Sequence, residues 1–375
     1  MSELENQFGS TGPDSAVLIT PPRADSHVHF REAEAEQVWN VRMVGRDTDT
    51  AVPILNLSRW IKTGAEAVEY RDNLRRIADR EGRDLDFVMS IMLAEDTTPA
   101  MIVEAKKLGV VEMKCMFDGL STNSRAQQAI MPDRLFEKIE TLRAIAGEGM
   151  IFAPHLEVKC LHGKKIRRWE REREAEPLVH ELLEQVPGIK IAVKHVSTAK
   201  LARALVRLRG AVGIELTPQH YETSVDDMID DKLNLANVFL PVPQDPEEDQ
   251  AYLRELAVAG YDFVWLGTDQ AVHPWAARKA KPLAACGAVS AHVAGPTAIK
   301  MFEQSGHSDW VSRLVRFWRR NFLAFYGVER KATRTLRWVK RSWTVPDWYE
   351  IEGLDDKVLP LLWGKTLDWQ LEEGS

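Results

Sequence analysis

The chain has 375 residues, of which 45% are hydrophobic and 28% charged. It can therefore bury a large core, and this composition is not that of a disordered or fibrous protein. Its formal net charge of -7 argues against a nucleic-acid-binding surface, which requires clustered positive charge. Three widely spaced cysteines provide neither a disulfide framework nor a CxxC metal motif, and they favour a reducing cytoplasm: Cys115, Cys160 and Cys286.

The first twenty residues are polar and acidic, and they lack the basic start and apolar stretch of a secretory signal. We expect residues 1–20 to form a flexible N-terminal extension. No later apolar run reaches the roughly 18 residues that a membrane span needs, so a soluble protein is expected. The length is compatible with one large barrel domain at residues 21–330 and a C-terminal segment, residues 331–375, that packs on it.

Short apolar, β-rich runs recur through the chain, and each is followed by a segment with helical spacing. This pattern is typical of parallel strands joined by crossover helices, and eight strands are the number that closes a barrel. The predicted fold class is therefore α/β, as a (β/α)8 TIM barrel. The predicted strands lie near Arg23–Val28, Ala51–Leu55, Asp86–Met92, Val110–Met113, Met150–Pro154, Ile189–Lys194, Val212–Leu216 and Asp262–Leu266.

The Trp-rich tail begins near Trp310. Residues 308–327 have helical spacing, and the later WTVPDWYE and KTLDWQL alternate as short strands do. We expect this tail to pack on the outside of the barrel.

Metal-capable side chains stand at the carboxyl ends of several predicted strands, where barrel enzymes assemble their sites. His27 and His29 alternate along the first strand, so both rings point to the same side. His155, His195 and Asp269 end the fifth, sixth and eighth strands. Four imidazoles and one carboxylate suit zinc. The alternative is that each histidine merely caps a strand by binding loop backbone.

Lys114 ends the predicted fourth strand beside Met113, Cys115 and Met116, which would desolvate its amine and lower the pKa. A neutral amine can react with carbon dioxide, and the resulting carbamate can bridge two cations. The alternative is an ordinary strand-end lysine that reaches solvent or pairs with a carboxylate.

These segments, taken in order, resemble the dihydroorotases of the short bacterial type within the metal-dependent amidohydrolase superfamily. The resemblance covers roughly residues 20 to 372. Its motifs are DSHVHFR (25–31), LNL (55–57), MKCMFDGLSTNS (113–124), APHLEV (153–158), KHVSTAKLA (194–202), TPQH (217–220) and LGTDQAVH (266–273).

The resemblance implies two zinc ions per subunit. One would be held by His27, His29 and Asp269 and the other by His155 and His195, with Lys114 bridging them as N6-carboxylysine. Further residues are implied to bind the substrate: Arg31, Asn56, His273 and the Ala271 backbone around its carboxylate, and Ser121, Thr122 and Asn123 in a closing loop. From the residues alone, Arg31 could equally pair with Glu32, Glu34 or Glu36, and His273 could cap a loop.

The implied reaction is interconversion of N-carbamoyl-L-aspartate and (S)-dihydroorotate in pyrimidine biosynthesis. A hydroxide bridging the two zinc ions would be the nucleophile, and Asp269 would carry the proton. The resemblance also implies a cytoplasmic homodimer. Two alternatives remain open: a relative acting on another carboxylate-bearing cyclic amide, imide or lactone, and a non-catalytic dihydroorotase-like subunit.

Overall fold

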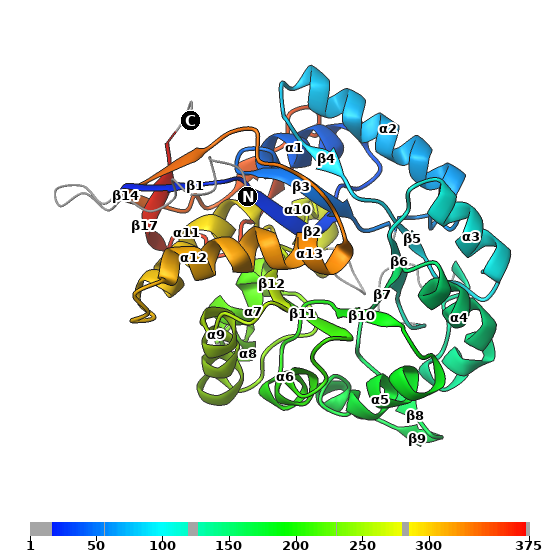
Figure 1. Ribbon diagram of the computed structural model, residues 1–375. Helices are drawn as coiled ribbons and strands as arrows, with labels where there is room; N and C mark the ends of the chain where they lie inside the picture. The colour runs from blue at the N-terminus through cyan, green and yellow to red at the C-terminus, as the bar shows by residue number, and fades with distance from the viewer. Residues whose placement is uncertain (1–16, 56, 119–126, 230, 280–284, 373–375) are drawn as a thin grey trace.

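The structure is a computed structural model that describes residues 17–55, 57–118, 127–229, 231–279 and 285–372. At its centre, parallel strands form a closed ring, and helices lie around the outside (Figure 1). The predicted (β/α)8 barrel is confirmed, with every predicted strand at its expected place. The barrel strands are β2 (Arg23–His29), β3 (Thr48–Pro53), β4 (Asp86–Phe87), β5 (Ser90–Met92), β6 (Glu112–Cys115), β7 (Ile151–Pro154), β10 (Lys190–Val193), β11 (Val212–Leu216), β12 (Val264–Leu266) and β13 (Gln270–Ala271).

The barrel is irregular at two of its eight strand positions. The predicted third strand is divided into β4, which pairs with β3, and β5, which pairs with β6. The eighth is divided into β12, which pairs with β11, and β13, which pairs with β2 and so closes the ring. Between them, Asp25 accepts hydrogen bonds from the backbone N–H and the hydroxyl of Thr268, at 2.9 and 2.6 Å. This side chain replaces part of the backbone ladder next to the candidate site.

One helix follows each barrel strand position, as the sequence pattern predicts. These helices are α1 (Glu34–Val44), α2 (Gly64–Arg80), α3 (Pro99–Lys107), α4 (Ile139–Gly147), α5 (Glu176–Gln185), α6 (Ala199–Val206), α9 (Ala251–Val258) and α11 (Ala291–Glu303). Shorter helices and turns are α7 (Pro218–Glu222), α8 (Val225–Met228), α10 (Trp275–Arg278), η3 (Pro132–Lys138), η4 (Arg168–Glu170), η5 (Leu235–Asn237) and η6 (Pro246–Gln250).

The predicted helix at residues 308–327 is present as three consecutive pieces, α12 (Trp310–Val315), η7 (Arg316–Arg320) and α13 (Asn321–Tyr326). It lies against β2 and β12 (Figure 1). The tail then forms β14 (Leu336–Thr344), β15 (Tyr349–Glu350), β16 (Lys357–Val358) and β17 (Thr366–Leu371). Elsewhere in the chain, a small hairpin follows β7 and consists of β8 (Cys160–Leu161) and β9 (Lys164–Lys165).

The tail strands pack on the barrel through a second, antiparallel sheet in the order β1-β14-β17, where β1 is Val17–Thr20. Trp338 and Trp369 of this sheet belong to the same buried cluster as the barrel core. Trp369 also donates a hydrogen bond to Glu303 of α11, at 3.1 Å. Strand β1 occupies the last four residues of the predicted extension, and residues 1–16 lie outside the described residues.

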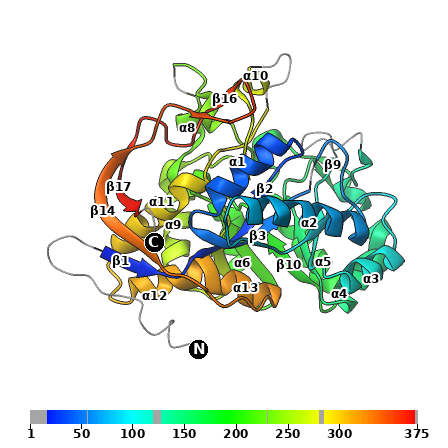
Figure 2. The same ribbon diagram turned by 90° about the horizontal axis from the view of Figure 1, so that it is seen from above.

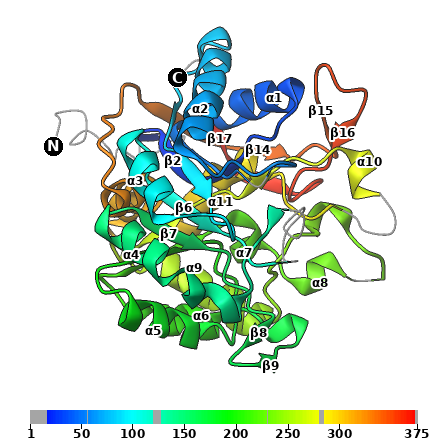
Figure 3. The ribbon, with the colours of Figure 1, turned by 90° about the vertical axis from the view of Figure 1, so that its right-hand side faces the viewer.

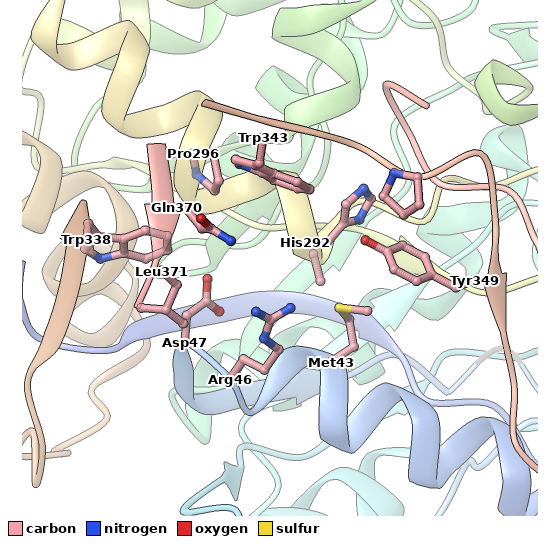
Figure 4. A pocket seen from close by; sticks show the side chains of 12 residues that line it. Met43, Arg46, Asp47, His292, Pro296, Trp338, Trp343, Tyr349, Gln370 and Leu371 are labelled. Atoms are coloured by element: carbon pink, nitrogen blue, oxygen red, sulfur yellow. The ribbon is translucent and has the colours of Figure 1, made fainter. Parts of the chain in front are cut away.

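A cavity of about 280 Å³ lies where the second sheet meets α1 and α11. Figure 4 shows the side chains of Arg46, Tyr349 and Gln370 around it, with Trp343 opposite. A larger, open groove of about 1160 Å³ runs past Asp226, Trp348 and other residues, where α8, α10 and the β15–β16 hairpin gather at one end of the molecule (Figures 2 and 3). Neither contains a predicted site residue.

Among the described residues, no helix has the length and apolar character needed to cross a membrane.

Candidate functional site

Two histidines of β2 and one aspartate from the end of the eighth strand form a compact cluster. Single ligand atoms of His27, His29 and Asp269 all lie within 4.8 Å of one another. The Asp269 carboxylate oxygen Oδ1 is 3.2 Å from His27 Nε2 and 3.1 Å from His29 Nε2. The i, i+2 spacing on β2 therefore brings both rings to one carboxylate, as predicted from strand geometry.

The other two predicted histidines form a second group beside the first. His155 follows β7, His195 follows β10, and His155 Nδ1 is 3.0 Å from His195 Nε2. The ring centroids of His195 and His27 are 5.4 Å apart, which connects the two groups. All four imidazoles are buried.

Lys114 lies in β6, and its side chain is fully buried with no hydrogen-bond partner for Nζ in the described part of the chain. Burial lowers its pKa to about 8, and the charge of nearby Lys194 adds to this shift. The charge of Lys114 in turn helps to lower the pKa of His27, His29 and His195, so the amine lies in the same interior. A lysine of this kind is easily deprotonated, as the sequence analysis expected.

Burial lowers the pKa of His27, His29 and His195 below the usual value for histidine. Their rings are therefore neutral at neutral pH, the form that binds metal. Burial has the opposite effect on Asp269, but the neighbouring His27 and His29 prevail and lower its pKa below the usual value. The cluster thus presents neutral imidazoles around an ionised carboxylate.

Three of these positions have left-handed backbone: φ is 72° at Arg31, 42° at His195 and 48° at Asp269. Residues other than glycine adopt this region rarely, and such strain gathers at functional sites. Here the left-handed conformation changes the direction of the chain, and so of each side chain, just after its strand ends.

The Arg31 side chain makes its hydrogen bonds with the segment that follows Asp269. Its Nε donates to the Val272 carbonyl at 2.9 Å, and its Nη2 lies 2.9 Å from His273 Nε2. The surface ion pair considered from sequence is not found among the described residues. Ala271 also belongs to this region, but its N–H donates to the Ala288 carbonyl at 2.8 Å, which leaves only its carbonyl for a substrate. Asn56, Ser121, Thr122 and Asn123 lie outside the described residues.

Three side chains that were not predicted from sequence contact these residues, and a fourth contacts one of the three. Gln219 donates to Asp269 Oδ2 at 3.2 Å, and Glu157 accepts from His155 Nε2 at 2.7 Å. Glu215 accepts from His27 Nδ1 at 2.7 Å, and Lys194 lies 3.3 Å from Glu215. A signal was present: Glu215 is a lone carboxylate inside the apolar strand VGIEL, and Glu157 stands two residues after His155.

The donor set fits metal ions. Within the part of the chain that the structure describes, four buried nitrogens at this site have no hydrogen-bond partner: His27 Nε2, His29 Nδ1, His195 Nδ1 and Lys114 Nζ. Leaving such groups unpaired is costly, so their concentration in one place indicates a further partner. Imidazole nitrogens with carboxylates are the ligands that zinc prefers.

Comparison with known proteins identifies the family. No protein-family model matches the chain. It is 28% identical to a dihydroorotase of Neisseria meningitidis, over 95% of this chain and 98% of the relative. It is 31% identical to a mitochondrial dihydroorotase of Oryza sativa, over 97% of this chain and 87% of the relative. The crystal structure of Saccharomyces cerevisiae dihydroorotase in complex with 5-fluoroorotic acid superposes with a TM-score of 0.85 at 23% identity, covering 95% and 98% of the two chains. With an eight-stranded barrel, histidines at its strand ends and these relatives along its whole length, the chain belongs to the dihydroorotase family.

Proposed function

We propose that this protein is a dihydroorotase, a cyclic amidohydrolase that interconverts (S)-dihydroorotate and N-carbamoyl-L-aspartate in pyrimidine biosynthesis. The observation that carries the proposal is the cluster of His27, His29 and Asp269 at the barrel mouth, in a chain related to dihydroorotases over 97% of its length.

Two zinc ions are the proposed cofactor. His27, His29 and Asp269 would hold one ion, His155 and His195 would hold the other, and Lys114, as its carbamate, would join them. The buried, unpaired nitrogens support this assignment. When bound, the ions would polarise the scissile carbonyl and lower the pKa of water.

Asp269 is the proposed proton carrier. Its neighbours keep its pKa low, so it is ionised and able to accept a proton from the attacking water. It would then deliver that proton to the ring nitrogen as the amide bond breaks. Gln219 holds the carboxylate through Oδ2, which leaves Oδ1 directed at His27 and His29.

Arg31 is proposed to bind the substrate carboxylate together with Asn56 and His273, and the Ala271 backbone is proposed to complete the pocket through its carbonyl, which accepts hydrogen bonds. The guanidinium is anchored by the Val272 carbonyl through Nε and contacts His273 through Nη2, so Nη1 and the second Nη2 hydrogen can face an anion. Ser121 and Thr122 are proposed to close over the bound ring. An acid-bearing substrate is therefore favoured over an uncharged ring.

We further propose a homodimer in the cytoplasm, with a small molecule as the only substrate and no nucleic-acid partner. The small number and wide spacing of the cysteines support the compartment, and the acidic composition supports the absence of a nucleic-acid partner; the homodimer is proposed from the resemblance to the dihydroorotase family. The rice relative is named as mitochondrial, so the compartment needs its own test by cell fractionation.

The decisive experiment is an assay of purified, zinc-loaded protein with dihydroorotate and with carbamoyl aspartate, beside hydantoin, succinimide and lactone panels. We expect turnover of the first two, loss of turnover with a chelator, and recovery with zinc. Activity confined to uncharged rings would contradict the role of Arg31 and favour another cyclic amide, imide or lactone. A chain that binds no zinc would favour the non-catalytic subunit.

A further inference from the structure

Glu215 occupies the interior of the barrel directly behind the candidate metal ligands. It lies in β11 and is fully buried. Its Oε1 accepts hydrogen bonds from His27 Nδ1 at 2.7 Å and from the His195 backbone N–H at 3.2 Å. Its backbone carbonyl also accepts from the Val196 N–H, at 3.0 Å. One residue therefore contacts both groups of histidines.

The contact with His27 determines which ring nitrogen faces the cluster. A carboxylate only accepts hydrogen bonds, so Nδ1 must carry the ring proton. In the neutral ring, Nε2 then has a free lone pair, and Nε2 is the atom that lies 3.2 Å from Asp269. The hydrogen bond from the His195 N–H stabilises the left-handed backbone conformation of His195, and this conformation sets the direction of its ring.

We propose that Glu215 is a positioning residue of the metal centre: it fixes the tautomer and orientation of His27 and holds the backbone of His195. This inference rests on the proposed function only in taking these two histidines as ligands. Outer partners of this kind generally raise metal affinity by orienting the ligating imidazole.

The surroundings of Glu215 hold its carboxylate in place. Its Oε2 accepts from Ser26 Oγ at 2.5 Å and lies 3.3 Å from Lys194 Nζ. Lys194 is 2.9 Å from Glu112, and although burial opposes it, the two glutamates raise the pKa of Lys194 above its usual value. Each Glu215 oxygen therefore has two donors, which compensates for the cost of burying this polar group.

Gly267 leaves the space that Glu215 fills. A Cβ atom at this position would lie 2.6 Å from the Glu215 carboxyl carbon, too close for any side chain. Gly267 stands between β12 and β13, where the eighth strand is interrupted before Asp269. The glycine that allows Glu215 to come this close therefore lies in the same strand position as Asp269.

The first test measures the tautomer of His27 in the metal-free protein by ¹⁵N NMR of its imidazole, with His27→Asn to assign the signal. We expect the proton on Nδ1 in the wild type. A proton on Nε2 would overturn the proposal, and this measurement requires neither activity nor a variant of Glu215 that folds.

The second test measures zinc affinity by chelator competition for Glu215→Gln and Glu215→Leu. We expect Glu215→Leu to weaken zinc binding by roughly 10- to 100-fold and Glu215→Gln, which retains an acceptor, to weaken it less. The matched control is Asp49→Asn. Asp49 is an equally buried carboxylate, and it pairs with Arg319 at 2.7 Å instead of contacting the histidines. It should lower the melting temperature without changing zinc affinity.

Wild-type zinc affinity in both Glu215 variants, or an equal loss in the Asp49 control, would overturn the proposal. Failure of the proposed function is separable, since it would leave the wild type without dihydroorotate turnover while the tautomer and zinc measurements still apply.

Discussion

Asp269 combines two tasks at one residue, since it is both a candidate ligand and the candidate proton carrier. Its carboxylate touches His27, His29 and Gln219, and its backbone is strained at φ 48°. The surrounding contacts hold this conformation, which turns the carboxylate into the cluster. Such a residue should be far more sensitive to replacement in catalysis than in substrate binding.

We therefore predict that Asp269→Ala lowers kcat by roughly 10²- to 10⁴-fold, the range for loss of a general acid–base group. Substrate binding should remain measurable by calorimetry, because Arg31 is unchanged. Metal content must be measured in the same sample. A near-normal rate in a metal-replete variant would contradict the assignment.

Glu172 shows a second effect of burial on a single residue. Its carboxylate accepts hydrogen bonds from the Ser197 N–H, at 2.8 Å, and from the Ser197 hydroxyl. Burial nevertheless raises its pKa from an ordinary 4.5 to about 8. Between these two pH values the folded protein holds a proton that the unfolded chain has lost, so stability must fall as the pH rises through this window.

Glu172→Gln should abolish this dependence, because an amide does not titrate and can still bind Ser197. The melting temperature of the variant relative to wild type should rise between pH 5 and pH 8.5. Glu184→Gln, at an exposed position on α5, is the control and should follow the wild type. Parallel pH profiles for wild type and Glu172→Gln would contradict the prediction.

At the level of elements, the barrel strands were predictable because short apolar, β-rich runs, each followed by a segment with helical spacing, are typical of parallel strands joined by helices. The interruptions of the third and eighth strands were not, since they depend on contacts such as Asp25 with Thr268 that join distant segments. Likewise, Asp133 after Pro132 reads as a helix cap, but helix η3 begins without a side-chain cap and Asp133 instead accepts from the Gly163 N–H, at 3.3 Å. The strand ends predicted where the histidines lie. The lone carboxylate in VGIEL marks Glu215 as unusual, but its contact with His27 depends on tertiary packing and could not be predicted from sequence.

The packing of β11 against β12 gives a sharper prediction. A Cβ atom on Gly213 would lie 2.1 Å from the ring of Trp265, which is fully buried and hydrogen-bonded to Ser26. Gly213→Ala should therefore destabilise the protein by about 1–3 kcal/mol through overpacking. Gly147→Ala is the matched control, because nothing lies within 4 Å of its added methyl group. Chemical denaturation measures both, and equal stabilities would contradict the packing argument.

For the whole molecule, the second sheet and the barrel share one core. Trp338 and Trp369 are buried within the barrel's own apolar cluster, so the tail should not unfold separately. Trp369→Ala should lower the free energy of unfolding by about 3–5 kcal/mol, as for other buried aromatic residues. Thermal unfolding should remain a single transition at a lower temperature.

Trp363→Ala is the control for that experiment, since Trp363 belongs to the same tail but is 45% exposed. It should change the melting temperature little. A separate, early transition in Trp369→Ala, with the barrel melting at the wild-type temperature, would show that sheet and barrel are independent.

The order β1-β14-β17 also brings the first and last described strands close together. Val17 is opposite Val339 on one side of β14, and Leu371 is opposite Trp338 on the other. Two strand spacings, about 10 Å, thus separate the first and last strands. The residues beyond them at each end are numerous enough to span that distance when fused. A circularly permuted gene, opened at the β8–β9 hairpin, should therefore encode the same barrel.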